Sequence, residues 1–231
     1  MWADIVLVLG AYLFGSVPHL FLLAKLRRID LSGDYHQDLW VRAGKVTGVM
    51  GVLGEFVKGA VPVLVARALG FDLFTMALAG LAAVCGQMWP VFTKFDGEKG
   101  NSIAIAMVIS LVPKPALLSI IVVIISILIR TVPRLIARSR LSEIEPIVGG
   151  SYSRALPLGM AAFFIILPLL CWYFDQPPEI IWCCVALLIV IMVRRLTAGL
   201  GKDLKASNDI RGIIVRRLLY DRATATWRDD T

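Results

Sequence analysis

The stretch Gly86–Gly100, G-Q-M-W-P-V-F-T-K-F-D-G-E-K-G, places a polar glycine–lysine turn between two apolar segments. Backbone N–H groups freed at Gly97 and Gly100, with the Lys99 ammonium beside them, form a concavity suited to a phosphate. Taken by its spacing alone, such a turn more often just connects two helices. The turn therefore predicts an anion site at a membrane edge only where the rest of the chain supports it.

The composition indicates the environment in which this chain folds, since 58% of its 231 residues are hydrophobic and only 18% are charged. Such values are typical of an integral membrane protein. Apolar runs predict spans near Ile5–Leu26, Val46–Leu69, Leu73–Phe92, Asn101–Val112, Ala116–Val132, Leu156–Phe174 and Ile180–Val193. The fourth run is too short to cross alone, and we expect a tilted or half-crossing helix, capped by Asn101 or Ser102.

The placement of basic residues predicts the topology, because short cytoplasmic loops are enriched in Lys and Arg. Alternate connections hold these cations: Lys25, Arg27, Arg28, Arg42, Lys45, Lys94, Lys99, Arg130, Arg134, Arg138, Arg140, Arg154, Arg194 and Arg195. The pattern predicts an external N-terminus and seven spans in the plasma membrane. We expect one all-α domain over residues 1–231, with a basic cytoplasmic tail at 194–231.

Polar residues inside apolar spans are the candidates for specific interactions, because ionisable groups are costly in lipid. Glu55 and Lys58 are three residues apart on one helix face, and the spacing predicts a structural ion pair ahead of a proton-transfer role. Pro18 should kink the first helix, and His19 should hydrogen-bond within the bundle. The four cysteines lack metal-ligand or disulfide spacing, so we expect no metal and no cofactor.

The C-terminal tail predicts a basic amphipathic helix. Ile210, Ile213, Ile214 and Leu218 recur at helical spacing, and arginines fill the other positions: Arg211, Arg216, Arg217 and Arg222. Such a helix is suited to the membrane interface. We favour general anchoring by positive charge over recognition of one lipid, and we do not expect nucleic acid as a partner.

Together these segments resemble the bacterial membrane-embedded glycerol-3-phosphate acyltransferases that use acyl phosphate as donor. The likeness rests on five stretches that follow in the same order along the chain: Gly15–Pro18, Leu23–Leu31, Glu55–Leu64, Gly86–Gly100 and Arg194–Gly199. The fourth stretch looks like the phosphate-holding loop of that family. The resemblance implies a seven-span acyltransferase of phospholipid synthesis.

This chain departs from the family pattern at polar positions. The glycine- and asparagine-rich first motif is absent from Ser32–Lys45, and Gln87 stands where the family has histidine. Asp96 and Glu98 add two carboxylates beside the proposed phosphate seat, which should weaken anion binding. The polar residues of the third motif have no counterpart, since their positions fall near Ile189, Met192 and Gly201.

The resemblance implies that a glycerol-3-phosphate hydroxyl, or that of a related polyol phosphate, attacks the acyl phosphate. Gly97, Lys99 and Gly100 would hold one phosphate. Their positive charge and their predicted place on the cytoplasmic side give four candidates for the second phosphate: Arg42, Lys45, Arg194 and Arg195. Three nearby groups can act as acid or base: His36, Asp96 and Glu98. The alternative is a non-catalytic relative that binds lipid or a membrane-protein partner.

Overall fold

The computed structural model describes residues 1–31, 35–137, 155–206 and 209–220, and within these ranges it is helical without a strand. Membrane spans favour helices because every backbone polar group must find its partner inside the segment. The helices are α1 (Trp2–Ser16), α2 (His19–Leu26), α3 (Tyr35–Arg42), α4 (Lys45–Ala68), α5 (Leu73–Met88), η1 (Val91–Thr93), α6 (Asn101–Leu111), α7 (Pro113–Ala137), α8 (Ala155–Tyr173), α9 (Pro178–Thr197), α10 (Leu200–Ala206) and α11 (Ile210–Tyr220).

Five helical segments are long and apolar enough to cross a membrane by length and composition. They are Trp2–Leu26, Lys45–Ala68, Leu73–Thr93, Leu156–Tyr173 and Pro178–Thr197. Two shorter apolar helices, Asn101–Leu111 and Pro113–Ile129, correspond to the fourth and fifth predicted spans. The all-α membrane architecture is confirmed, whereas seven crossings stay a prediction.

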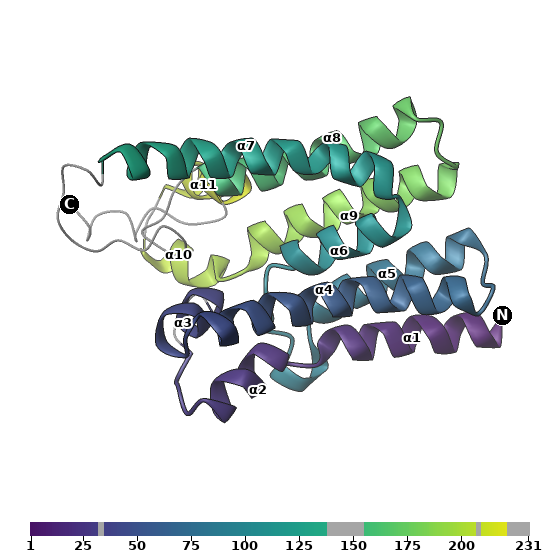
Figure 1. Cartoon of the computed structure of the whole chain (residues 1–231), viewed down its shortest axis with the longest axis horizontal. Coiled ribbons are helices and arrows are strands. Elements are labelled where there is room, and N and C mark those ends of the chain that lie inside the picture. The colour runs from purple at the N-terminus through teal and green to yellow at the C-terminus, as the bar shows by residue number, and fades with distance from the viewer. Residues whose placement is uncertain (32–34, 138–154, 207–208, 221–231) are drawn as a thin grey trace.

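The helices form an elongated bundle (Figure 1). In that view α7 and α8 lie along one edge, α1, α4 and α5 along the other, and α6 and α9 between them. The N-terminus and the connections α4–α5, α6–α7 and α8–α9 lie toward one end, while α2, α3, α10 and α11 lie toward the other. The turn that joins α5 to α6 lies part-way along the bundle.

Helices α1 and α5 approach each other closely. A Cβ at Gly15 would lie 2.1 Å from the Ala83 carbonyl oxygen, and one at Gly86 would lie 2.1 Å from that of Tyr12. Small residues let membrane helices approach at backbone distance. The main core lies deeper, where Phe163, Phe164, Leu187 and Ile191 are fully buried and pack with α5 and α6. The Gly86 end of the predicted loop is thus a helix-packing position.

Three expectations need correction or qualification. The charged segment after α2 is partly helical, because α3 buries Leu39 completely between α2 and α4. Helix α9 continues to Thr197, so Arg194 and Arg195 are buried helical residues and not the start of a solvated tail. Three cations used for the topology, Arg138, Arg140 and Arg154, lie outside the described residues, and so does Arg222 of the predicted tail helix.

Candidate functional site

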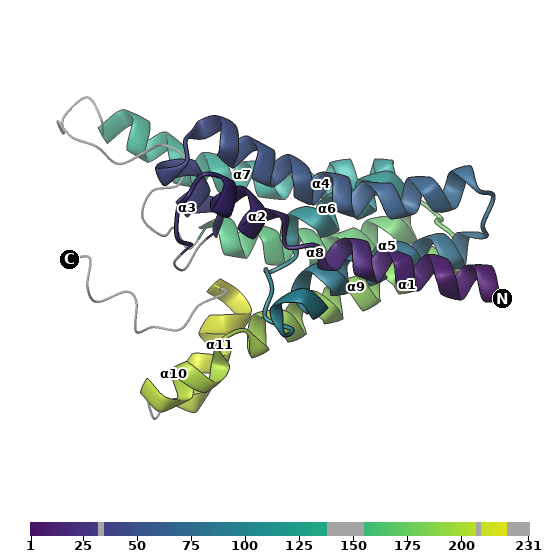
Figure 2. The ribbon, with the colours of Figure 1, turned by 90° about the horizontal axis from the view of Figure 1, so that it is seen from below.

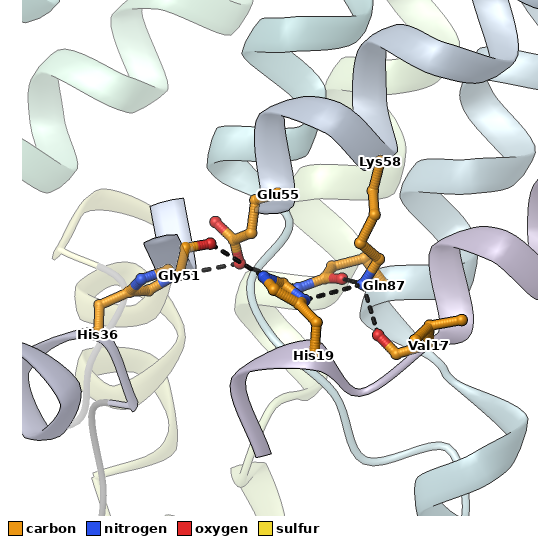
Figure 3. A network of polar contacts seen from close by, with 7 residues as sticks. All are labelled: Val17, His19, His36, Gly51, Glu55, Lys58 and Gln87. Carbon is orange, nitrogen blue, oxygen red and sulfur yellow. Dashed lines mark hydrogen bonds and ion pairs between the residues drawn. The ribbon is translucent and has the colours of Figure 1, made fainter. Parts of the chain in front are cut away.

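The first membrane segment is broken at Val17 and Pro18, as the proline predicted. Pro18 has no N–H and cannot continue the hydrogen bonds of α1. The Val17 carbonyl accepts hydrogen bonds from the His19 N–H at 2.9 Å and from Lys58 Nζ at 2.7 Å (Figure 3). Lys58 is buried on α4. The break is thus held by an ammonium group from another helix.

Gln87 of α5 joins this lysine to a carboxylate. Its Oε1 accepts from Lys58 Nζ, and its Nε2 donates to Glu55 Oε1 at 2.9 Å. An ammonium only donates and a carboxylate only accepts, so the orientation of the amide is fixed by its partners. The predicted direct ion pair between Glu55 and Lys58 is wrong, because they interact through Gln87.

Two histidines flank the same cluster (Figure 3). His19 Nε2 lies 2.9 Å from the Gly51 carbonyl oxygen and must donate, which leaves Nδ1 to accept from Lys58 Nζ at 3.4 Å. His36 of α3 places Nε2 3.1 Å from Glu55 Oε1. The prediction that His19 hydrogen-bonds within the bundle is confirmed. His36 lies on a helix beside the cluster and not in an open loop.

A pocket of about 220 Å³ opens beside the helix break. The polar side chains that line it are Ser16, His19, Tyr35, Gln87, Thr93, Asp96 and Glu98. Burial first, and then the charges of Glu98 and Asp96, raise the pKa of the Tyr35 hydroxyl. That hydroxyl therefore stays protonated as a donor, and the pocket combines neutral donors with two carboxylates.

The glycine turn forms one wall of this pocket and packs tightly on the end of α5. A Cβ at Gly97 would lie 2.3 Å from the Gln87 carbonyl oxygen, and one at Gly100 would lie 2.4 Å from Met88 Cε. The Glu98 N–H donates to the Gln87 carbonyl at 3.1 Å. Gly100 also has a left-handed φ of 75°, which favours glycine. The close approach of these neighbouring atoms explains why both positions hold glycine.

Gly100 is the N-cap of α6, and no side chain caps this helix. The expected cap by Asn101 or Ser102 is wrong, because both residues lie inside the first turn of α6. The Asn101 Oδ1 atom is buried and has no hydrogen-bond partner among the described residues. The uncapped start of α6, with half-buried Lys99 before it, keeps the geometry of an anion seat.

Arg194 connects the end of α9 to the turn. Its Nη2 donates to the Gly97 carbonyl and lies 3.4 Å from Asp96 Oδ1. Its guanidinium also lies over the Trp89 ring, 6.0 Å from the centroid. Arg194 is buried, whereas the Asp96 side chain is 92% exposed. The structure therefore shows Arg194 holding the backbone of the turn.

The other predicted cations lie apart from the pocket. Arg42 donates to the Asp30 carbonyl at 3.1 Å and lies 3.4 Å from Asp38 Oδ1. Lys45 is exposed at the first turn of α4. Arg195 is buried and donates to two carbonyls, as described below. None of the three lines the pocket, and neither do Lys99 and Arg194, which lie beside it next to the glycine turn.

Sequence reasoning gave no site role to Tyr35, His19, Gln87 or Lys58, although it noted that the last three are polar. The available signal was Pro18, because a broken membrane helix needs polar partners from its neighbours. Within the described ranges, no three His, Cys, Asp or Glu side chains come together as metal ligands would. The cluster consists of hydrogen-bonding groups, so it suits a ligand that donates and accepts hydrogen bonds.

Known proteins resemble this chain in both sequence and fold. The sequence model described as glycerol-3-phosphate acyltransferase matches residues 5–199. A protein of that name from Geotalea daltonii is 38% identical over 118 residues, which are 49% of this chain and 61% of the relative. Another from Trichlorobacter lovleyi is 29% identical over 217 residues, covering 89% of this chain and all of the relative. The matched length thus ranges from about three fifths of a relative to the whole.

Solved structures extend the likeness to three dimensions. Two crystal structures of PlsY (YgiH), an integral membrane glycerol 3-phosphate acyltransferase, superpose on 88% of this chain and 93% of theirs. The lysophosphatidic acid form gives a TM-score of 0.68 at 26% identity, and the glycerol 3-phosphate form gives 0.66 at 27%. This chain is therefore a multi-pass membrane protein that belongs to the glycerol-3-phosphate acyltransferase family.

Proposed function

We propose that this chain acylates glycerol 3-phosphate, or a related polyol phosphate, in phospholipid synthesis. Its relatives carry the name of that activity, and PlsY has been crystallised in glycerol 3-phosphate and lysophosphatidic acid forms. The observation that carries the proposal is the pocket between the α1–α2 break and the glycine turn. Its polar donors come from four separate segments of the chain, which suits a small, hydroxyl-rich ligand.

The donor we propose is an acyl phosphate, as the family resemblance implies. The acceptor hydroxyl oxygen attacks the acyl carbonyl carbon, the bond from that carbon to the phosphate oxygen breaks, and the departing phosphate takes up the hydroxyl proton. Because phosphate is already a good leaving group, the protein needs mainly to position both substrates and to stabilise negative charge. A covalent acyl-enzyme is not required.

We assign the phosphate seat to Lys99 and the uncapped N-terminus of α6, with Arg194 holding the turn in place. Free N–H groups at a helix start favour anions, and a lysine beside them adds a full charge. His36, Asp96 and Glu98 stay candidates for proton transfer, and Glu98 is the one that is both half-buried and in the pocket wall. Its charge opposes phosphate binding, so its useful contact is with an acceptor hydroxyl.

A direct assay tests this function. Purified protein in lipid nanodiscs should release inorganic phosphate from acyl phosphate only when glycerol 3-phosphate is present, and Lys99→Ala should lower that rate. Lys114→Ala is the matched control, because Lys114 is an exposed lysine in the first turn of α7 that contacts Phe174. Wild type that turns over no acyl phosphate with any polyol phosphate would favour the non-catalytic alternative.

We also propose that the N-terminus faces outward and that the end carrying α3 and α9–α11 faces the cytoplasm. The support is the segregation of the connections to two ends of the bundle (Figure 1), together with the preference of Lys and Arg for cytoplasmic loops. Single cysteines at Lys45 and Glu179, introduced one at a time, should differ in reaction with an impermeant thiol reagent. Labelling of Lys45→Cys in intact cells would reverse the assignment.

A further inference from the structure

Helices α10 and α11 form a separate unit at the end of α9 (Figure 2), and they follow the region matched by the family model, which ends at residue 199. Arg217 of α11 is buried and donates to the carbonyls of Arg195 and Ala198 at 3.3 and 2.5 Å. It also forms an ion pair with Asp203 of α10. One arginine thus ties α11 to the last carbonyls of α9.

Arg195 forms the reciprocal contact. It is buried on α9 and donates from Nη1 to the carbonyls of Leu218 and Pro157, both at 3.2 Å. Each arginine therefore satisfies backbone groups of the other's helix, and α8 is included through Pro157. Guanidinium groups suit this role because they offer several donors in a fixed plane. The orientation of α11 on the bundle is set by these contacts.

With the Arg217 face turned inward, α11 presents an apolar face outward. Ile210, Ile214, Val215 and Leu219 are 57%, 39%, 52% and 42% exposed, whereas Ile213 on the inner face is 1% exposed. At about 100° per residue these side chains spread as a broad apolar stripe over roughly half of the helix surface, opposite Ile213, and exposed Arg211 lies among them. Four large aliphatic side chains on one face of an eleven-residue helix are far more than scattered surface residues require.

The charges beside this stripe are mainly positive. The segment Leu200–Tyr220 holds five Lys and Arg residues and two Asp residues, which gives a net charge of +3. The two carboxylates face Arg216 and Arg217. Lys205 and Arg211 are exposed. An exposed apolar stripe that carries Arg211 within it and further cations beside it is complementary to an anionic lipid surface.

We propose that α11 lies in the head-group layer of the membrane, with its apolar stripe toward the acyl chains and its cations toward anionic lipid phosphates. The helices that α11 contacts also expose large apolar side chains, among them Leu158 of α8 and Ile189 and Val193 of α9. A lipid surface covers this whole area at once. In this arrangement the contacts of Arg195 and Arg217 between α9 and α11 hold this end of the bundle at the membrane surface.

The test uses full-length protein with an environment-sensitive fluorophore on Val215→Cys. The matched reference is the same label on Glu179→Cys, which lies in the exposed first turn of α9 at the other end of the bundle. Unmodified protein measures background labelling of the native cysteines, three of which are buried. Vesicles contain phosphatidylcholine alone, or an equal mixture with phosphatidylglycerol, and some carry a nitroxide on the lipid acyl chain.

In the mixed vesicles the label at position 215 should be quenched by the nitroxide lipid and shielded from aqueous iodide severalfold better than the label at position 179. Arg211→Glu should weaken the seating of α11 in lipid by at least roughly fivefold, because it removes one attractive charge and adds a repelled one. A second label on Leu219→Cys should behave as at 215, which excludes a local effect of one substitution.

Three results would overturn the proposal. Iodide access at 215 equal to that at 179 would place α11 in water. Protection from both iodide and nitroxide lipid would mean that protein, such as a second copy of the chain, covers the stripe. Equal quenching in both vesicle types, unchanged by Arg211→Glu, would remove the role of anionic lipid. None of these readouts depends on acyltransfer, so the proposed function stands or falls separately.

Discussion

Replacing Arg194 with alanine should disturb the glycine turn far more than replacing its ionic neighbour Asp96 with asparagine. The guanidinium donates to the Gly97 carbonyl from a buried position, and a hydrogen bond to a charged group contributes about 1.5–3 kcal/mol. The Asp96 carboxylate lies 3.4 Å away but is 92% exposed, and such a pair contributes about 0–1 kcal/mol.

If the turn forms the phosphate seat, the loss appears in substrate affinity. Expressed fully in binding, 1.5–3 kcal/mol weakens the affinity roughly 10- to 150-fold, whereas Asp96→Asn changes it fivefold at most. Calorimetric titration of glycerol 3-phosphate into each nanodisc-reconstituted variant gives this comparison, and thermal unfolding reports the stability of each. Equal losses in the two variants, or an Arg194→Ala protein with wild-type affinity, would refute the assignment of Arg194 to the turn.

Gly97→Ala should abolish activity and lower the unfolding temperature, because the new Cβ would lie 2.3 Å from the Gln87 carbonyl oxygen; Gly10→Ala meets no atom within 4 Å and should behave as wild type in both assays. Lys99→Ala should weaken glycerol 3-phosphate binding by about 1.5–3 kcal/mol in a titration, and unchanged binding would make the turn a mere connector. Glu98→Gln should tighten phosphate binding severalfold by removing a like charge from the pocket wall, while a fall in turnover of the same variant would mark Glu98 as the group that receives the hydroxyl proton.

Hydropathy predicted the helices well because long apolar runs leave the backbone little choice in lipid. It placed α4 and α8 within a residue or two of their observed ends. It failed where polar residues are buried by contacts. Arg195 ends the apolar run of α9, but carbonyls of Pro157 and Leu218 satisfy it, so the helix continues. Charged α3 was missed because its sequence shows no apolar run, although Leu39 is fully buried and Trp40 packs on Gly48 of α4.

The candidate site was predictable in part. Gly97 and the neighbouring carboxylates line a pocket, as the turn suggested, because those residues are consecutive in sequence. The link from Lys58 through Gln87 to Glu55 was not predictable, since it joins residues about thirty positions apart. Spacing on one helix predicted a direct pair of Glu55 and Lys58. Gln87 of a second helix, α5, is the better-placed partner for both side chains.

Lys58 and Glu55 also bear on how the chain enters the bilayer. A charged residue at the centre of an isolated helix costs roughly 2.5–3.5 kcal/mol on insertion. Helix α4 carries two, and their partners lie at Val17, at His36 and on α5. Helix α4 alone should therefore pass inefficiently from the translocation channel into lipid. We expect it to enter the bilayer together with its neighbours, so that the N-terminal half of the protein inserts as one assembled unit.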